Sequence, residues 1–412
     1  MLANSTMKNS GIEWIGEIPE DWNIAPIGHL YSERKQKVSD TVYKPLSVTK
    51  QGVVPQLDSA AKSDAHDDRK LVCIGDFAIN SRSDRRGSCG ISDYEGSISL
   101  INTVLTPKAK IIPKYFDWLF HTTMFADEFY KWGHGIVADL WTTNWSDMKK
   151  IMVTLPPQLE QQKIADFLDE KCCHIDSVLE KTRASIDEYK QLKQSVITKA
   201  VTKGIRPNRP MKNSGIEWIG EIPEDWKIKK LKYSCSNRNE NYSSDYGLLE
   251  YFALENIESK SARFIHTESV YDITQSQICK ENDVVFGKLR PYLAKVYQVP
   301  TLCCCSGEFA VFCDFEGVAD YYKYIMLSHW FINIVDASTY GTKMPRANIQ
   351  FIKNMDIAVP SKTEQTEIVS YLDNKCSEID KLITKKEQLV TELEIYKKSL
   401  IYEYVTGKKE VC

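Results

Sequence analysis

MKNSGIEWIGEIPEDW occupies residues 7–22, and the same sixteen letters recur 204 positions later at residues 211–226. Similar segments also close the two halves at this offset: LPP and EQ within 155–161 return as VPS and EQ within 359–365, and FLDEKC at 167–172 returns as YLDNKC at 371–376. Between these framing segments the halves have diverged. A period of this length is too long for a solenoid repeat, so it indicates a duplicated module. Identical ends predict contact with the same kind of surface twice, and divergent middles predict two different surfaces.

The composition is that of a soluble globular protein with more than one domain: 412 residues, 42% hydrophobic and 26% charged. No apolar run approaches the roughly 20 residues of a membrane span, and the first residues lack a signal-peptide core, so we expect no membrane partner. The twelve cysteines include the run 303–305 and no C-x-x-C pair, which favours reduced thiols and a cytoplasmic location.

The charge balance gives a mixed indication about nucleic acid. A net charge of −3 and a pI near 6.2 argue mildly against a nucleic-acid binder. Residues 190–212 nevertheless carry seven bases and no acid. This stretch fits a solvated helix end and linker, and it fits a phosphate-facing stripe equally well.

Each half is predicted to form a compact mixed domain followed by one long helix. The first half has strand-like stretches at 71–79, 99–105 and 151–155 and helical spacing over 114–132. The second repeats this order, with strands at 283–286, 309–312 and 355–359 and a helix over 320–336.

A heptad-like apolar seam follows the prolines at 156 and 360, with a lysine at the same place in both copies. The first seam is Leu168, Cys172, Ile175, Leu179, Thr182, Ile186, Tyr189, Lys193, Val196 and Ala200; the second is Leu372, Cys376, Ile379, Ile383, Lys386, Val390, Leu393, Lys397, Leu400 and Tyr404. Gly204, Pro207 and Pro210 end the first helix. Each helix, roughly 60 Å long, needs an apolar partner. An antiparallel pair is the simplest solution, and packing of each helix on its own domain is the alternative.

The predicted fold class is therefore mixed α+β, with two globular domains separated by two long helices that form an antiparallel coiled coil, and with an internal pseudo-two-fold repeat. The expected boundaries are 1–154 and 207–358 for the globular domains and 155–206 and 359–412 for the helices.

The sequence carries none of the common catalytic motifs. It lacks a phosphate-binding G-x-x-x-x-G-K-[ST], a G-x-G-x-x-G after a strand, an H-E-x-x-H, and the N-P-P-Y or D-P-P-Y type of methyl-transfer motif. Two weaker alternatives are a metal site among Cys279, residues 303–305 and Cys313, and a nuclease-like cluster of Glu308, Asp314 and Glu316 near Lys288. Strand-end acids are usually solvated, so we expect no catalysis and no metal in this chain.

Two pairs of polar loops remain as candidate nucleic-acid contacts, because Arg suits guanine, Asn suits adenine, and Ser and Arg also hold phosphate. The first half supplies Asn80, Ser81, Arg82, Arg85 and Arg86, with Thr142 and Asn144; the second supplies Lys288, Arg290 and Tyr292, with Lys343, Arg346 and Asn348. A loop cation in water is the plainer interpretation for any one of them. The hypothesis depends on the same loop pair carrying different polar letters in each copy.

The repeated S-G-I-E-W-I-G-E-I-P-E-D-W, the L-P-P-x-x-E-Q and the helix with D-x-K-C-x-x-I-D resemble the specificity subunit of type I restriction-modification systems over nearly the whole chain. The resemblance implies two target-recognition domains, each reading half of a bipartite site in double-stranded DNA. It implies conserved helices that set the gap between the half-sites, and framing regions that dock two methyltransferase subunits, which restriction and translocase subunits then join. Catalysis, S-adenosylmethionine, Mg and ATP would belong to those partners.

Three other functions are alternatives. A stand-alone two-headed DNA-binding regulator would bind its site tightly without a partner. An orphan nuclease or transferase would act with metal or methyl donor alone, and a coiled-coil adaptor would not bind DNA. The duplicated framing argues against the regulator, the missing motifs against the enzyme, and the divergent loops against the adaptor.

Overall fold

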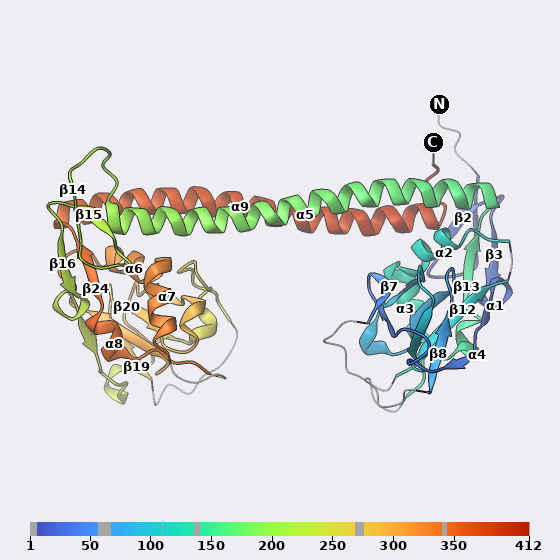
Figure 1. Cartoon of the computed structure of the whole chain (residues 1–412), viewed down its shortest axis with the longest axis horizontal. Coiled ribbons are helices and arrows are strands. Elements are labelled where there is room, and N and C mark those ends of the chain that lie inside the picture. Colours follow the sequence, from blue (N-terminus) through green and yellow to red (C-terminus); the bar gives the residue numbers. More distant parts are fainter. Residues whose placement is uncertain are drawn as a thin grey trace. The chain divides into compact units, whose positions relative to one another are not determined.

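The computed structural model of the chain describes residues 6–56, 67–108, 110–135, 141–267, 276–339 and 344–411. Its internal contacts divide the chain into two units: unit 1 is Met1–Thr182 with Gln388–Cys412, and unit 2 is Arg183–Glu387. The two long helices are α5 (Gln158–Lys203) and α9 (Lys362–Val405), and each of them has one part in unit 1 and the other part in unit 2 (Figure 1). Within the described ranges, no helix has both the length and the apolar content for crossing a membrane.

The globular part of unit 1 is rich in short strands. Its elements are β1 (Met7–Asn9), β2 (Glu17–Pro19), β3 (Asn23–Pro26), α1 (Ile27–Leu30), β4 (Tyr31–Glu33), β5 (Lys37–Val38), β6 (Leu46–Thr49), β7 (Gly52–Pro55), β8 (Arg69–Val72), β9 (Phe77–Asn80), the 3-10 turn η1 (Ser83–Arg85), β10 (Cys89–Ile91), β11 (Gly96–Ser99), β12 (Asn102–Pro107), α2 (Pro113–Phe120), α3 (Thr123–Lys131), α4 (Trp145–Met148) and β13 (Met152–Leu155).

The globular part of unit 2 repeats this succession with local changes. Its elements are β14 (Met211–Asn213), β15 (Glu221–Pro223), β16 (Lys227–Lys230), η3 (Leu231–Tyr233), β17 (Ser236–Arg238), η4 (Ser244–Tyr246), β18 (Tyr251–Phe252), η5 (Leu254–Asn256), β19 (Gln277–Cys279), β20 (Val284–Gly287), η6 (Pro291–Leu293), β21 (Val296–Gln298), β22 (Cys303–Cys305), β23 (Phe309–Cys313), α6 (Ala319–Leu327), α7 (His329–Ala337), α8 (Ile349–Asn354) and β24 (Asp356–Val359).

Each unit contains the same four-stranded antiparallel sheet. The strand order is β10-β9-β12-β4 in unit 1 and β21-β20-β23-β17 in unit 2. In both, the strand after the framing segment pairs with the strand before the long helix: β3 with β13, and β16 with β24. The predicted mixed fold with an internal repeat is therefore confirmed.

Several predicted elements are divided in the structure. The predicted strand at 71–79 is two strands, β8 and β9, because the Asp76 carboxylate accepts the Cys73 N–H at 2.9 Å and closes a turn between them. The stretch 99–105 likewise contains the end of β11, a turn and most of β12. Each predicted helix of the globular parts is a pair, broken at Thr122 and at Ser328, where the backbone is extended. Hydroxyl side chains favour such helix starts, and the spacing of apolar residues cannot reveal them.

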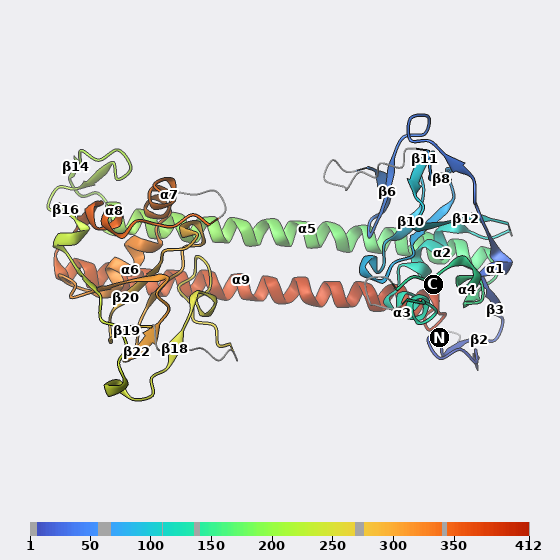
Figure 2. The ribbon, with the colours of Figure 1, turned by 90° about the horizontal axis from the view of Figure 1, so that it is seen from below.

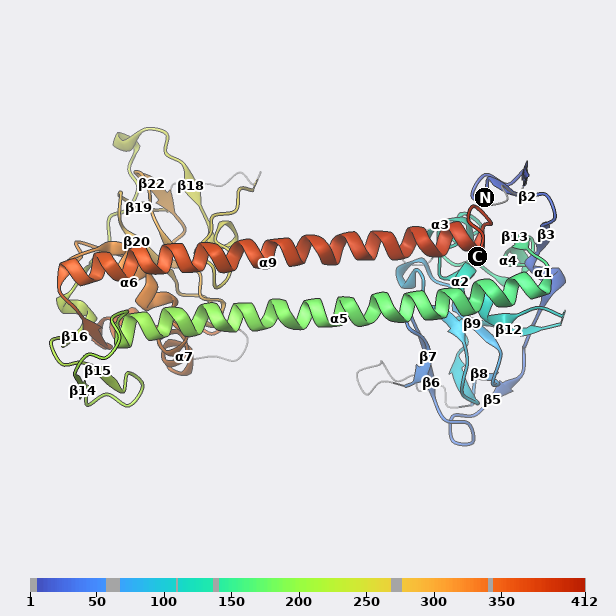
Figure 3. The same cartoon turned by 90° about the horizontal axis from the view of Figure 1, so that it is seen from above.

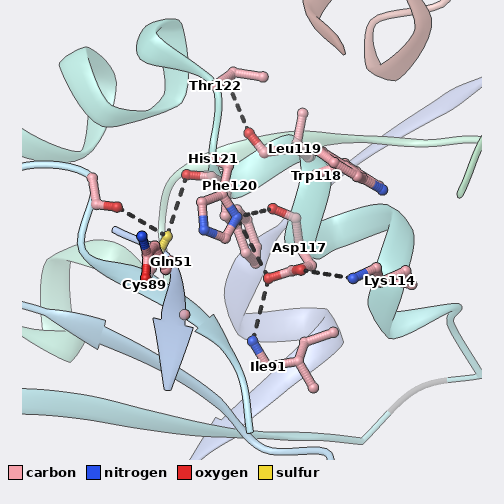
Figure 4. Close-up of polar contacts among 12 residues, drawn as sticks. Gln51, Cys89, Ile91, Lys114, Asp117, Trp118, Leu119, Phe120, His121 and Thr122 are labelled. Atoms are coloured by element: carbon pink, nitrogen blue, oxygen red, sulfur yellow. Dashed lines mark hydrogen bonds and ion pairs between the residues drawn. The ribbon is translucent and has the colours of Figure 1, made fainter. Parts of the chain in front are cut away.

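Helix α2 is tied to the edge strand β10 by polar contacts as well as by apolar packing. The Asp117 carboxylate accepts the Ile91 N–H at 3.2 Å, and the buried Cys89 thiol points at the Phe120 carbonyl (Figure 4). The Phe120 ring meets the Phe77 ring of β9 with centroids 4.7 Å apart. These contacts fix the sheet on which the first candidate loop is mounted.

The long helices run side by side and antiparallel within each unit, as Figures 2 and 3 show. In unit 1 the Phe167 ring contacts the Tyr404 ring, and further along α5 Asp176 contacts Lys397. Residue numbers therefore rise along α5 while those of its contacts on α9 fall, as antiparallel helices require. The predicted antiparallel pairing is confirmed. The helices also pack on the globular parts: Leu168 and Leu400 share one apolar core with α2, and Ile197 and Leu372 share another with α6. The two arrangements considered from the sequence thus occur together.

The seam lysines belong to a repeated ion pair. Lys193 Nζ lies 2.7 Å from the Asp380 carboxylate, and Lys397 Nζ lies 2.6 Å from the Asp176 carboxylate. Each aspartate ends the D-x-K-C-x-x-I-D stretch of one copy, and each lysine belongs to the other copy. The Lys193 side chain is 10% exposed, so its charge needs this partner.

The framing segments fasten each globular part to the helices. Trp22 Nε1 donates to Glu160 at 2.9 Å, and Trp226 Nε1 donates to Glu364 at 3.0 Å, at the common offset. The buried Tyr115 hydroxyl donates to the Val405 carbonyl at 2.7 Å, where α9 ends. Gly407 follows at φ +72°, where an added Cβ would clash with Pro19.

Candidate nucleic-acid interface

The two loops predicted from the first half lie together in unit 1. Arg82 and Thr142 form an antiparallel backbone bridge, and the Thr143 N–H donates to the Ser81 carbonyl at 3.0 Å. The Tyr130 hydroxyl of α3 also donates to the Arg82 carbonyl at 3.0 Å. Loops that are about 60 positions apart in the sequence therefore form one surface, and α3 supports it.

A cavity of about 520 Å³ opens at this junction, and its lining is strongly basic. Four predicted residues line it: Ser81, Arg82, Thr142 and Asn144. Three lysines that the sequence reasoning missed also line it: Lys35, Lys70 and Lys149, with Glu33 as the acid among them. Partial burial lowers the pKa of Lys70, so an anion in the cavity would stabilise its charged form. The arrangement suits a phosphate or an electronegative base edge.

The predicted residues of the first unit differ in burial and in whether their side chains already have hydrogen-bond or ionic partners. Asn80 is buried, and its side chain accepts the Arg82 N–H at 3.0 Å, while the buried Ser81 hydroxyl bonds Thr103. Arg85 is 68% exposed. Arg86 pairs with Asp127 and lies over the Tyr130 ring. Asn144 begins α4 without a capping bond from its side chain, so its amide is available to a ligand.

The corresponding loops of unit 2 also meet through the backbone. Leu289 bridges Arg346, and the Arg290 N–H donates to the Pro345 carbonyl at 2.8 Å. The Ala347 N–H donates to the Lys288 carbonyl at the same distance. The same loop pairing thus occurs in both units with different side chains.

The predicted residues of unit 2 are mostly exposed. Arg290 is exposed in the left-handed region, at φ +51°, and Tyr292 next to it is 44% exposed. The Arg346 side chain is 62% exposed and donates to Glu308 at 2.6 Å, and Lys288 is partly buried. Asn348 caps α8 by accepting the Gln350 N–H at 2.8 Å, unlike Asn144. Lys343 lies outside the described residues.

Each unit also contains an arginine bound to a buried aspartate at the start of the strand that leads to its first candidate loop, which was not predicted from the sequence. Arg34 binds both oxygens of Asp76 at 2.6 and 3.0 Å, and Arg238 binds Asp283 in the same way at 2.7 and 3.0 Å. The bond to the carboxylate is the main cause that raises the pKa of each guanidinium. The available signal was an arginine repeated at offset 204, together with an aspartate inside a predicted strand in each half, Asp76 within 71–79 and Asp283 within 283–286.

The cysteine run and the strand-end carboxylates of unit 2 have structural roles. Cys303–Cys305 is the central strand of a three-stranded sheet, and no group of three or more His, Cys, Asp or Glu side chains in the described ranges could hold a metal ion. Among the carboxylates of the nuclease-like cluster, Glu308 binds Arg346 and Glu316 binds Lys229.

Comparison with known proteins gives consistent matches. The family model described as "Type I restriction modification DNA specificity domain" matches residues 223–392. Two curated relatives from Methanocaldococcus jannaschii, the type I restriction enzyme MjaVIII specificity subunit and the putative MjaX specificity subunit, are each 23% identical. They align with 96% of this chain and with 94% and 96% of their own lengths.

Solved structures share the fold. A chain from a structure described as concerning complex assembly and conformational transition of the type I R-M system matches with a TM-score of 0.71 and 13% identity, covering 95% of this chain and 99% of its own. The HsdS subunit from Thermoanaerobacter tengcongensis matches with a TM-score of 0.53 and 15% identity, covering 95% and 98%. Residues 223–392 match the family model, and the two curated relatives show that this chain is similar over nearly its whole length to specificity subunits of type I restriction enzymes.

Proposed function

We propose that this chain selects a bipartite DNA site, with residues 1–154 and 207–358 each reading one half-site and residues 155–206 and 359–412 acting as the spacer. The observation that carries the proposal is the backbone bridge between the two candidate loops in each unit, Arg82 with Thr142 and Leu289 with Arg346. A repeated scaffold that holds different side chains is what two different half-sites require, because base edges differ while the duplex backbone is common.

In unit 1, Arg82 and Asn144 are the proposed base contacts. Both line the basic cavity, and neither side chain is needed to cap or close its own loop. Lys35, Lys70 and Lys149 surround them and would hold phosphates. Asn80, Ser81, Arg85, Arg86 and Thr142 shape or extend this surface. In unit 2, Arg290, Tyr292 and Arg346 take the corresponding places by their exposure, and Lys288, Lys343 and Asn348 complete the predicted set.

Docking of two methyltransferase subunits is proposed for the framing segments 7–22 and 211–226. Their letters are identical, and each joins a globular part to the end of a helix through the same Trp–Glu hydrogen bond. Restriction and translocase subunits would join that complex. In this allocation the chain itself catalyses nothing, and the methyl donor, Mg and ATP are bound by the partner subunits.

The test is to map the methylated DNA site in cells that carry the methyltransferase subunit with variants of this chain. Arg82→Ala is expected to cost about 1–3 kcal/mol of discrimination at one base pair and to relax only the half-site read by unit 1. Arg346→Ala should relax only the other half-site. Arg183→Ala, on α5 and outside both candidate loops, is the matched control and should leave the site unchanged. A site in which each variant relaxes both halves equally would contradict the two-domain allocation.

A further inference from the structure

Two segments of identical sequence have different surroundings. Trp14 is 7% exposed, whereas its counterpart Trp218 is 43% exposed. The letters of residues 7–22 and 211–226 are the same, and both form a hairpin with the same register, β1 with β2 and β14 with β15. The difference in exposure therefore arises from the residues that pack on each hairpin.

The end of α9 holds the first hairpin down. The Tyr402 hydroxyl donates to the Trp14 carbonyl at 3.1 Å, and Lys408 Nζ donates to the Ile15 carbonyl at 2.7 Å. The Trp14 ring then packs edge-on against Phe125, with centroids 6.1 Å apart. At the same offset the first copy carries Thr198 and Gly204, which are too short to make either bond. The Thr198 hydroxyl is itself buried without a partner in the described structure.

The charge beside the two hairpins also differs. The C-terminal end of α5 and the hairpin residues Met211 and Glu221 line one cavity of about 670 Å³, to which Lys199, Lys203 and Arg206 contribute. At the same offset the last turn of α9 carries Glu403, and the residues after this helix include Gly407 and Glu410. The second hairpin thus shares a cavity with Lys199, Lys203 and Arg206, the last of which pairs with Glu367 at 2.6 Å, whereas the sequence carries two acids and a glycine at the equivalent positions of the second copy.

We propose that the two framing segments are unequal docking sites, and that residues 211–226 take up the methyltransferase subunit first and more tightly. The proposal rests on the docking function proposed above. Trp218 supplies an exposed aromatic anchor, which is the residue type most enriched among strong protein–protein contacts. Lys199, Lys203 and Arg206 select a partner surface whose apolar pocket is bordered by carboxylates. Docking at residues 7–22 must first displace Tyr402 and Lys408, so it is weaker.

The test is a titration of the full-length chain with purified methyltransferase subunit, followed by native mass spectrometry and calorimetry at low and moderate salt. We expect a one-to-one complex to form before the two-to-one complex, with a first dissociation constant at least about tenfold lower than the second. Trp218→Ala should raise the lower constant by about tenfold, with partial rescue by Trp218→Phe, and salt should weaken the tighter site more. Because Trp218 is exposed, neither variant should alter the far-ultraviolet circular dichroism.

A reciprocal pair of variants provides the matched control. Tyr402→Thr with Lys408→Gly gives the first hairpin the neighbours of the second and should bring the two dissociation constants closer together. Thr198→Tyr should instead weaken the tighter site by covering the second hairpin. If the two dissociation constants were equal and Trp218→Ala changed neither of them, the proposal of unequal docking sites would be overturned, while the docking function itself would stand. Absence of any complex would overturn the docking function itself. Loss of DNA binding by Trp218→Ala, with normal subunit titration, would reassign this face to DNA and also overturn the proposal.

Discussion

Glu160 and Glu364 occupy equivalent positions, yet replacing each by glutamine should have different consequences. Both accept the indole N–H of a framing tryptophan. Glu364 is buried, at 3% side-chain exposure, and is also bound by Arg209, whose side chain is 13% exposed. No ion pair within 4 Å of Glu160 occurs in the described part of unit 1, and burial is the main cause that raises its pKa. The negative charge of Glu364 is therefore compensated by Arg209, whereas that of Glu160 is not compensated by an ion pair.

The magnitudes follow from these contacts. Glu364→Gln keeps the acceptor for Trp226 but removes the charge facing Arg209, whose other carboxylate partner among the described residues is the exposed Asp225 at 2.6 Å. Losing one member of a buried pair costs about 3–5 kcal/mol, and the remaining Asp225 contact reduces this to about 2–3 kcal/mol. Glu160→Gln removes an uncompensated charge while keeping the bond to Trp22, so its expected effect at neutral pH is within about 0.5 kcal/mol of zero.

Amide hydrogen exchange measures the two segments separately within one protein. Glu364→Gln should accelerate exchange in peptides from 211–226 by about 30- to 150-fold, which is about 2–3 kcal/mol of local opening energy. Glu160→Gln should change exchange in peptides from 7–22 by less than about threefold. Comparable acceleration by both variants would refute the reasoning, because the hydrogen bond and not the ion pair would then hold the tryptophan.

Three further outcomes follow from the same contacts. Because burial raises the pKa of Glu160 in the folded state above its ordinary value of 4.5, its contribution to stability is present at low pH and is lost as pH rises through the folded-state pKa. The wild-type melting temperature minus that of Glu160→Gln should therefore fall as pH rises above 4.5. Asp380→Leu should destabilise unit 2 by about 2–4 kcal/mol by leaving the buried Lys193 ammonium unpaired, whereas Lys193→Leu should lie within about 1 kcal/mol of wild type in thermal unfolding; equal losses would contradict this. Asn348→Ala should cost about 1 kcal/mol in urea unfolding through loss of the α8 cap, whereas Asn144→Ala should weaken DNA binding of the assembled complex without a measurable stability loss.

The sequence predicted the features that depend on repetition and period. The offset of 204 identified two equivalent halves, and the heptad spacing identified an antiparallel helix pair whose lysines, Lys193 and Lys397, proved to be paired with aspartates across the seam. One pair of polar loops was also predicted in each half, because equivalent positions carry polar residues in both halves. These features are local or periodic, so a single sequence records them directly.

Features set by distant neighbours could not be predicted in this way. The helix breaks lie at Thr122, whose hydroxyl accepts the Phe125 N–H, and at Ser328, whose hydroxyl donates back to the Ile325 carbonyl, and the apolar period registers neither contact. The lysines of the basic cavity come from three separate stretches, and only folding brings them together. Trp14 and Trp218 are the clearest case, because they lie in identical segments but differ in exposure. The neighbour that covers the first segment, Tyr402, is distant from it in the sequence, whereas the equivalent residue of the second segment is close to it.

The most direct measurement of the central claim is modified-base sequencing of DNA from cells that express the methyltransferase subunit with and without this chain. If the chain is the specificity subunit of that system, methylated adenine should occur at one asymmetric motif with a fixed gap, and only when the chain is present. A soluble complex that leaves the methylation pattern unchanged, or methylation at the same motif without the chain, would contradict the assignment.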